Sequence, residues 1–240
     1  MTAQRSIFFT LILFMSGLPA YGKTYKPLYL VELFTSQGCS SCPPAEKWLN
    51  SLANHPGQFN QFVTIAFHVD YWDYLGWKDT FSQEKFSQRQ RRYRQENQFQ
   101  SVATPTIAVN GVPYFRWRKN EMPKLSKIKL PGMQIVREKS EIKITWKTNI
   151  KGDLKVWYAP LSGHKKIKIS KGENAGRTLR HHHSALALYE QKMSYDKKNQ
   201  QYVAKLAIND KLVGNAAGFA AWISSTKTQK PIVATGGKLR

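Results

Sequence analysis

Over the first half of the chain, segments with the hydrophobic pattern of a strand alternate with segments that have the pattern of a helix. Short runs rich in β-branched and aromatic residues, bounded by turn-forming residues, predict strands. These strands are expected at residues 28–34, 62–69, 106–109 and 112–117. Amphipathic segments predict helices at residues 43–53 and 81–99, and the aromatic stretch 70–77 is expected to be a loop. This alternation of strands and helices indicates an α/β domain.

Beyond residue 130 the apolar residues recur at every second position instead. That period is typical of strands that bury one face, here with lysines on the solvated face. The segments with this pattern lie at residues 142–146, 156–158, 167–169, 186–188 and 202–208. We therefore expect a β-rich, sandwich-like domain at residues 130–240, after an α/β domain at residues 23–129.

Residues 1–22 have the pattern of a secretory signal peptide. Arg5 precedes the apolar run Ile7–Leu18, and Ala20 and Gly22 supply small residues for cleavage before Lys23. The run is shorter than the roughly 20 residues that cross a bilayer, and an uncleaved anchor is the alternative. We expect a secreted or periplasmic protein with no membrane span once the signal peptide is removed.

The charge balance changes the range of expected partners. The chain has 37 Lys and Arg residues against 15 Asp and Glu residues, which gives a net charge of +22 and a pI near 10.0. A basic surface favours contact with anionic polymers, and the basic segment 85–94 contributes to it. Because an exported protein rarely meets nucleic acid, we expect anionic envelope polymers and no specific nucleic-acid partner. The sequence leaves the oligomeric state open.

The two cysteines exclude a disulfide-rich scaffold and a four-cysteine zinc module. Cys39 and Cys42 follow a predicted strand and open a predicted helix, with prolines in its first turn. At a helix N-terminus the dipole and the free N–H groups favour a thiolate. We expect Cys39 to attack a disulfide and Cys42 to resolve the mixed disulfide. No cofactor is predicted besides this redox-active disulfide.

Two other roles of the cysteine pair stay open. A passive disulfide is one, although so short a loop constrains the unfolded chain little. Metal binding through the cysteines and a histidine is the other, with His55, His68 and His181–His183 as candidates. None of them lies at a recognised zinc spacing, so no metal ligand is predicted. The triplet is expected to be an exposed polar strand or turn, in which at most two imidazoles could share an ion.

The segment Thr104–Gly111 resembles the cis-proline segment of the thioredoxin superfamily. The resemblance implies a thioredoxin-like fold for residues 23–129, with a cis peptide bond before Pro105 that lies against the cysteines. It also implies that the backbone of Thr104 pairs with bound substrate like an added strand. Glu32 resembles the buried acid that accepts the proton of the resolving cysteine, although its spacing to the motif is one residue longer than in that superfamily. An outward-facing Glu32 on an edge strand is the alternative.

Four residues at the end of the second predicted strand and in the loop after it are further candidates. His68 is expected at the sheet edge where the cysteine turn also emerges, and could tune Cys39 or shuttle a proton. Tyr71, Trp72 and Trp77 could line a groove for an unfolded or peptide substrate. The alternative is that the aromatic residues cap the core and that His68 is a hydrogen-bonded core residue.

Residues 31–45, VELFTSQGCSSCPPA, are the first of several motifs spread over both halves of the chain. The others lie at residues 66–79, at Arg89, Gln90 and Tyr93, and at residues 104–111 and 172–179. Together they resemble an uncharacterised family of bacterial secreted proteins, domain of unknown function 1223. The resemblance implies a thioredoxin-like domain followed by a β-rich domain, and no established activity. The chain is more basic than we expect of that family.

These observations predict an exported thiol-disulfide oxidoreductase that exchanges disulfides with protein or small-molecule thiols. One alternative is a non-enzymatic binding protein on the same scaffold, in which the disulfide is structural. Another is a copper- or zinc-handling protein. The direction of exchange stays open, because it depends on how strongly the reduced thiolate is stabilised.

Overall fold

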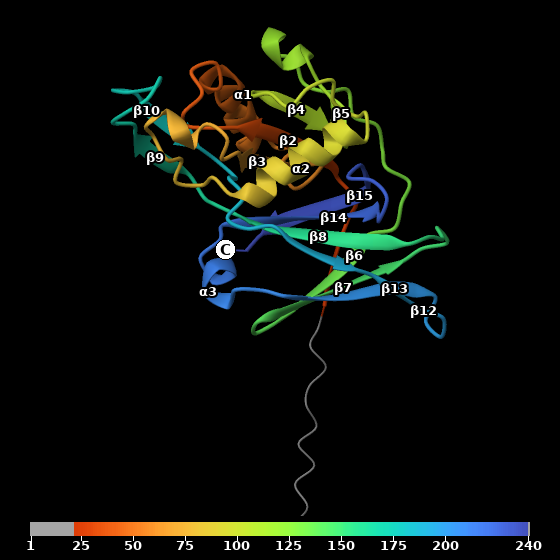
Figure 1. The fold of residues 1–240 in the computed structure, drawn as a ribbon. Coiled ribbons are helices and arrows are strands. Elements are labelled where there is room, and N and C mark those ends of the chain that lie inside the picture. The colour runs from red at the N-terminus through yellow and green to blue at the C-terminus, as the bar shows by residue number, and fades with distance from the viewer. Residues whose placement is uncertain (1–21, 240) are drawn as a thin grey trace, which may run out of the picture.

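Three α-helices and fifteen strands in four sheets make up residues 22–239, the part of the chain that the computed structural model describes (Figure 1). Within that range every helix is too short or too polar to span a lipid bilayer. The predicted signal peptide, residues 1–22, lies outside the described residues except for Gly22. The sheets stack in layers, and the order of the layers positions the cysteines.

The first sheet lies beneath helix α1 (Pro43–Ala53). Its strands follow the order β3 (Phe62–His68), β2 (Tyr29–Thr35), β4 (Thr106–Val109) and β5 (Val112–Pro113). β2 runs parallel to β3 and antiparallel to β4. Because alternate residues of a strand face opposite sides, Val31 and Leu33 pack with Trp48 and Leu49 of α1. One face of the sheet is thus covered by a helix.

The opposite face of the first sheet packs against helix α2 (Glu84–Gln95) and a second sheet. The strands of the second sheet are β11 (Tyr189–Lys192), β8 (Leu154–Leu161), β14 (Gly218–Ser225) and β15 (Pro231–Lys238). Leu30 and Phe34 of β2 share one core with Trp157 and Trp222 of the second sheet. This core joins residues from both halves of the chain.

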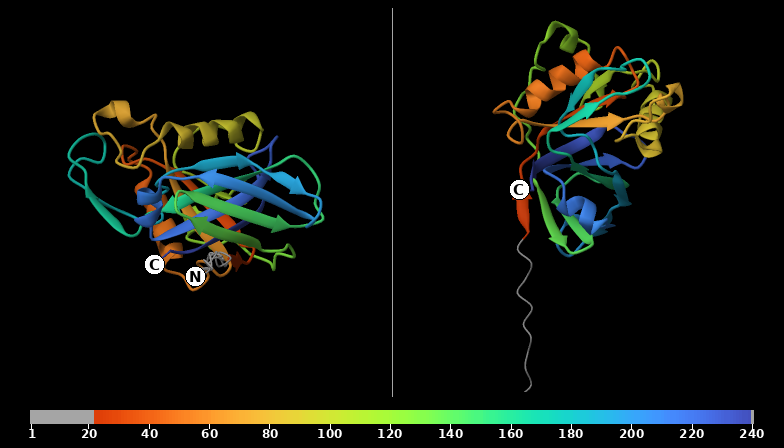
Figure 2. Two further views of the ribbon diagram at one scale, coloured as in Figure 1. Left: turned by 90° about the horizontal axis from the view of Figure 1, so that it is seen from below. Right: turned by 90° about the vertical axis from the view of Figure 1, so that its left-hand side faces the viewer.

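A third sheet covers the far side of the second one (Figure 2). Its strands are β1 (Lys23–Tyr25), β6 (Met133–Glu138), β7 (Glu141–Lys147), β13 (Gln201–Ala207) and β12 (Ser194–Asp196). Ile144 and Trp146 of β7 meet Phe219 and Ile223 of β14 in this second core. The short helix α3 (Asp210–Gly214) follows β13.

A two-stranded hairpin, β9 (Lys165–Lys168) and β10 (Thr178–His181), lies beside α1 (Figure 1). Just after β10, Ser184 forms an isolated bridge with Ala66 of β3. Two short 3₁₀ helices, η1 (Asp73–Leu75) and η2 (Arg116–Lys119), complete the secondary structure of the described residues. The hairpin brings a segment from the second half of the chain to the edge of the first sheet where α1 begins.

The predicted fold class is wrong. The sequence predicts an α/β fold, thioredoxin-like at residues 23–129, but 39% of the described residues lie in strands and 16% in helices. With several sheets and three helices among residues 22–239, the chain is mostly β and is not an α/β thioredoxin fold. The physical reason is that the second sheet covers much of the face where an α/β fold places helices.

Candidate functional site

The cysteine pair lies in the loop that joins β2 to α1. Cys42 is the N-cap residue of α1, and Pro43 and Pro44 occupy the first turn, where a missing N–H breaks no helical hydrogen bond. Cys39 and Cys42 form a disulfide, and both residues are 0% exposed. The N-terminus of α1 therefore carries a disulfide that is shielded from solvent.

The Thr104–Pro105 segment lies against Cys39. The carbonyl oxygen of Thr104 is 3.9 Å from Cys39 Sγ, and the peptide bond to Pro105 is cis. Trp72 Nε1 donates a 2.8 Å hydrogen bond to Thr104 Oγ1. Ser41 Oγ is 3.4 Å from Cys39 Sγ, so its hydroxyl could donate to a thiolate at that sulfur. Segments that are distant in the sequence thus meet around Cys39.

A cover loop, residues 169–177 between β9 and β10, closes over the cysteine loop. Asn174 Nδ2 donates to the carbonyl oxygens of Gln37 and Cys39, both at 2.9 Å. Asn174 is itself fully buried. The cover loop therefore supplies a donor to the Gln37 carbonyl and a second donor to the Cys39 carbonyl, which also accepts from the Cys42 N–H.

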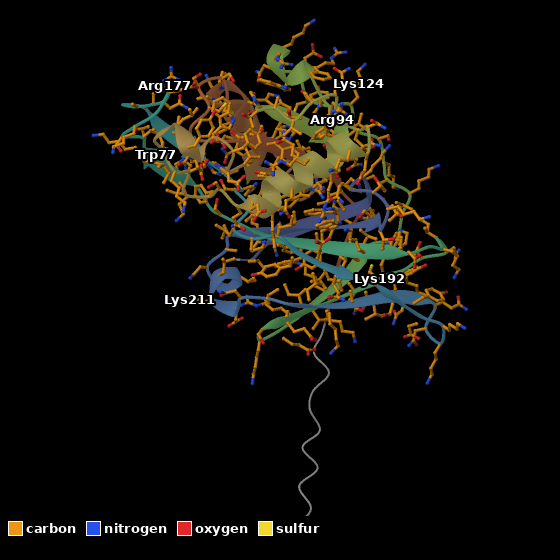
Figure 3. The ribbon with its side chains drawn as sticks, viewed as in Figure 1. Trp77, Arg94, Lys124, Arg177, Lys192 and Lys211 are labelled. Atoms are coloured by element: carbon orange, nitrogen blue, oxygen red, sulfur yellow. A yellow bond between two sulfur atoms is a disulfide. The ribbon has the colours of Figure 1, made fainter. Side chains whose placement is uncertain are left out.

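Two further contacts hold the cover loop in place. The carboxylate of Glu173 accepts a hydrogen bond from the backbone N–H of Ser40 at 3.0 Å, and hydrogen bonding from Ser40 lowers the pKa of Glu173. Gly172 has a φ of +75°, and a Cβ there would lie 3.4 Å from Trp77 Cβ. A contact at that distance is tolerated, so the left-handed φ is what favours glycine at this position. Figure 3 shows Trp77 and Arg177 at the same end of the molecule.

Asn174→Ala is expected to speed reduction of the disulfide by dithiothreitol about 30-fold. Each lost hydrogen bond contributes about 1 kcal/mol, so losing two raises the population of the open cover loop by about that factor. The measurement is the time course of cysteine alkylation after reductant is added. Asn199→Ala, the same change in an exposed turn, is the control and should leave the rate unaltered. Equal rates in Asn174→Ala and the unmodified protein would show that the cover loop does not limit access.

The predicted groove residues Tyr71, Trp72 and Trp77 are half-buried. The Tyr71 hydroxyl donates to Gln90 Oε1 at 3.0 Å, and burial raises the pKa of Tyr71 to about 12. Trp77 Nε1 donates to Gln37 Oε1 at 2.9 Å. Trp72 is hydrogen-bonded to Thr104, so the aromatic loop at residues 70–77 contacts both the cysteine loop and the Thr104–Pro105 segment.

His68 is fully buried at the end of β3, between two polar partners. Its Nδ1 is 2.7 Å from Asp79 Oδ2, and its Nε2 is 3.1 Å from Ser184 Oγ. Burial acts to lower the pKa of His68, but the Asp79 carboxylate outweighs burial and raises it. Burial acts to raise the pKa of Asp79, but the interaction with His68 outweighs burial and lowers it. Asp79 also accepts from the Gln37 N–H at 2.7 Å, so His68 is connected to the cysteine loop through Asp79.

His181 lies next to His68, with 5.0 Å between the ring centroids. Its Nδ1 is 2.9 Å from Glu46 Oε2 on α1. His183 is also buried, and burial lowers its pKa to about 4. The expectation of an exposed histidine triplet is therefore wrong, because β10 and the residues after it pack against α1 and β3.

Glu32 faces the side of β2 away from α1, since Val31 and Leu33 on either side of it face the helix. Its carboxylate forms a buried ion pair with Arg89 of α2, with an Nη2–Oε1 distance of 2.6 Å. The Tyr93 hydroxyl donates to the second carboxylate oxygen at 2.8 Å. The structure thus places Glu32 with α2 and pairs it with Arg89, on the face opposite the helix that carries Cys42.

Sequence reasoning missed several polar residues around the cysteines. These are Glu46, Asp79, Glu173 and Asn174, together with the inward position of His181. The motifs at residues 66–79 and 172–179 contain three of them and were the available signal. Neither periodicity nor spacing indicated what those residues contact.

Residues 30–224 match the family described as "Protein of unknown function (DUF1223)". The chain belongs to this family. The matched range includes the cysteine loop, the Thr104–Pro105 segment and the cover loop. Membership of this family assigns no activity, so the function has to be argued from the site.

Two solved structures are similar to this chain. An X-ray structure of a protein from Agrobacterium tumefaciens is 22% identical, with a TM-score of 0.60 over 87% of this chain and 92% of that one. HBP35 of Porphyromonas gingivalis is 15% identical, with a TM-score of 0.58 over 90% of this chain and 76% of that one. At these identities the likeness is one of fold. A search of curated proteins finds no match.

Proposed function

We propose that this protein is an exported thiol-disulfide oxidoreductase whose reactive group is the Cys39–Cys42 disulfide. The observation that carries the proposal is the position of Cys39 Sγ, beside the Thr104 carbonyl and just before the N-terminus of α1. The helix dipole favours a thiolate there, and the Ser41 hydroxyl, 3.4 Å from Cys39 Sγ, can donate to it. A disulfide next to a proline segment is the part of the resemblance to the thioredoxin superfamily that supports this chemistry.

Exchange begins when a substrate thiolate attacks Cys39 Sγ. A bond forms between the substrate sulfur and Cys39, and the Cys39–Cys42 bond breaks with its electron pair leaving on Cys42. A second substrate thiolate attacks the substrate sulfur of this mixed disulfide and releases Cys39 as a thiolate. The two substrate thiols have become a disulfide, and the protein holds the two electrons as a dithiol. In the reverse direction Cys39 attacks a substrate disulfide and Cys42 resolves the intermediate.

Substrates are protein or small-molecule thiols and disulfides. The backbone of Thr104, beside Cys39 Sγ, would pair with an extended substrate segment as an added strand does. Export is part of the proposal, supported by the apolar leader after Arg5 and by a disulfide that persists in oxidising compartments. The net charge of +22 supports contact with anionic envelope polymers.

The full burial of both cysteines favours a second candidate function. In this candidate the protein is a non-enzymatic binding protein, and the disulfide only fixes the loop before α1. A metal site that uses the cysteine sulfurs would require both to be reduced, whereas the structure pairs them. The two candidates differ in the redox behaviour that they predict.

The deciding experiment is a redox titration of the mature protein against glutathione, with the alkylation of Cys39 followed as a function of pH. An exchange catalyst should have a reduction potential above about −230 mV and a Cys39 thiolate that persists below the ordinary thiol pKa. A potential below about −300 mV with an unreactive Cys39 would contradict the proposal and support the structural disulfide.

A further inference from the structure

A second group of reactive side chains lies apart from the disulfide, in the protein interior. Glu46 of α1, His68 of β3 and His181 of β10 are all buried. Each offers one oxygen or nitrogen atom, and these three atoms lie within 4.8 Å of one another. Three separate elements therefore place an oxygen and two imidazole nitrogens around one point.

Glu46 and His181 are spaced about as closely as two ligands of one ion, and the ligand atom of His68 lies within 4.8 Å of both. Two donors that each lie about 2.0–2.1 Å from a tetrahedral zinc ion are roughly 3.3 Å apart. Glu46 Oε2 and His181 Nδ1 are 2.9 Å apart. His68 and His181 stand edge to face, at an interplanar angle of 74°. An inward shift of His68 would complete a three-ligand arrangement.

Each of the three side chains is also held by a second polar partner, which for His181 is Gln37, with 3.3 Å between the two Nε2 atoms. Asp79 binds His68 through Nδ1 at 2.7 Å, which leaves Nε2 facing Ser184 Oγ. The Thr35 hydroxyl donates to Glu46 Oε1 at 2.7 Å, on the oxygen that does not face His181. A carboxylate on the far nitrogen of a ligating histidine is the outer-sphere arrangement that fixes the tautomer in zinc sites.

A purely structural role explains this group less well. Burying two carboxylates and two imidazoles is costly, and apolar residues of similar volume would pack as stably. A divalent cation would be neutralised by Glu46 and Asp79 together, the two buried carboxylates of the group. Imidazole and carboxylate donors suit zinc, whereas calcium and magnesium prefer oxygen alone.

We propose that Glu46, His68 and His181 form a buried zinc site, with Asp79 orienting His68. The site is independent of the proposed redox function, because none of its ligands is a cysteine. It would tie the first turn of α1, which follows the N-cap residue Cys42, to the β9–β10 hairpin. Zinc would thus hold together the helix that presents the disulfide and the hairpin that carries the cover loop.

The test is binding of Zn²⁺ to the full mature protein with its disulfide intact, in competition with a chromophoric chelator. One ion per chain should bind with a Kd below about 1 μM. His181→Gln should weaken binding at least about 100-fold, since it removes a ligand. Asp79→Asn should weaken it about 10–100-fold, since it removes the group that orients His68.

His182→Gln is the matched control, because His182 is the next residue along the chain but its ring lies against His164, with 4.7 Å between the ring centroids. Its zinc affinity should equal that of the unmodified protein. The visible spectrum of Co²⁺ bound to the unmodified protein gives a readout that does not depend on the variants folding. A tetrahedral spectrum without a sulfur-to-metal band would support the proposal. Failure to bind one ion, a sulfur band, or equal loss in His182→Gln and His181→Gln would overturn it.

Discussion

Cys39→Ser is expected to lower thiol-disulfide exchange by at least about three orders of magnitude, because the variant has lost the reacting group itself. No sulfur then remains beside the Thr104 carbonyl to form the mixed disulfide. The fold should persist, because losing the disulfide of so short a loop costs only about 2 kcal/mol. The measurement is the initial rate of disulfide formation in a dithiol peptide, with circular dichroism to establish folding.

Cys42→Ser is the matched control, since it removes the same disulfide and keeps the attacking sulfur. It should also lose turnover, but it should accumulate a mixed disulfide between Cys39 and the substrate, detectable by intact mass. Accumulation of the adduct in Cys39→Ser instead would reverse the roles of the two cysteines. Unchanged turnover in both variants would contradict a redox role for the pair.

Arg89→Met is expected to destabilise the protein by about 3–5 kcal/mol, because it leaves the buried Glu32 carboxylate without its cation. The Arg89 guanidinium is 1% exposed and is enclosed by aromatic rings, the nearest being Trp222 at 4.6 Å and Tyr93 at 4.9 Å. Its Nη1 also donates to Gln229 Oε1 at 3.2 Å. The change would be measured as the free energy of unfolding in urea.

Two further variants separate the ion pair from general packing. The double variant Glu32→Leu with Arg89→Met removes both charges and should recover most of the loss, because the uncompensated carboxylate is gone. Arg92→Ala, on a half-exposed position of the same helix, should change stability by less than about 0.5 kcal/mol. A loss below 1 kcal/mol in Arg89→Met would show that water reaches Glu32.

The sequence predicted the bounds of an element correctly where residues next to each other in the chain decide them. Helix α1 has the predicted bounds, Pro43–Ala53, because two prolines open it just after the cysteine turn. Strand β4 likewise spans Thr106–Val109. Helix α2 is shorter than predicted, Glu84–Gln95 rather than residues 81–99, since Asn97 adopts a left-handed φ of 57° just beyond it.

Strands β14 and β15 carry no alternating pattern, because the second sheet is buried on both faces. Phe219 and Ile223 of β14 face the third sheet, whereas Ala220 and Trp222 face the first one. Apolar residues on both faces remove the period of two from which a strand would be predicted. The same two-sided burial explains why the predicted α/β fold class is wrong, since a sheet lies where helices were expected.

In the candidate site, contacts within one loop could be predicted from the sequence, whereas contacts between distant segments could not. The spacing of Cys39 and Cys42 indicated the disulfide, because both residues lie within one loop. The contacts of the cysteine loop with Asn174, and of Glu46 with His181, join segments more than 130 positions apart. No local pattern encodes such contacts. For Glu32, the apolar run predicted burial, but the partner that decides its role lies on another element.

The pairing of the chain's early and late segments has a kinetic consequence. Leu28 bridges Ala234, and Lys23 of β1 pairs with Ile135 of β6. These contacts close very long loops, and proteins rich in such contacts fold slowly. The face of the first sheet that packs against the second sheet stays partly uncovered until β15 has been synthesised. We therefore expect folding to finish only after synthesis of that strand, with the earlier segments depending on chaperones until then.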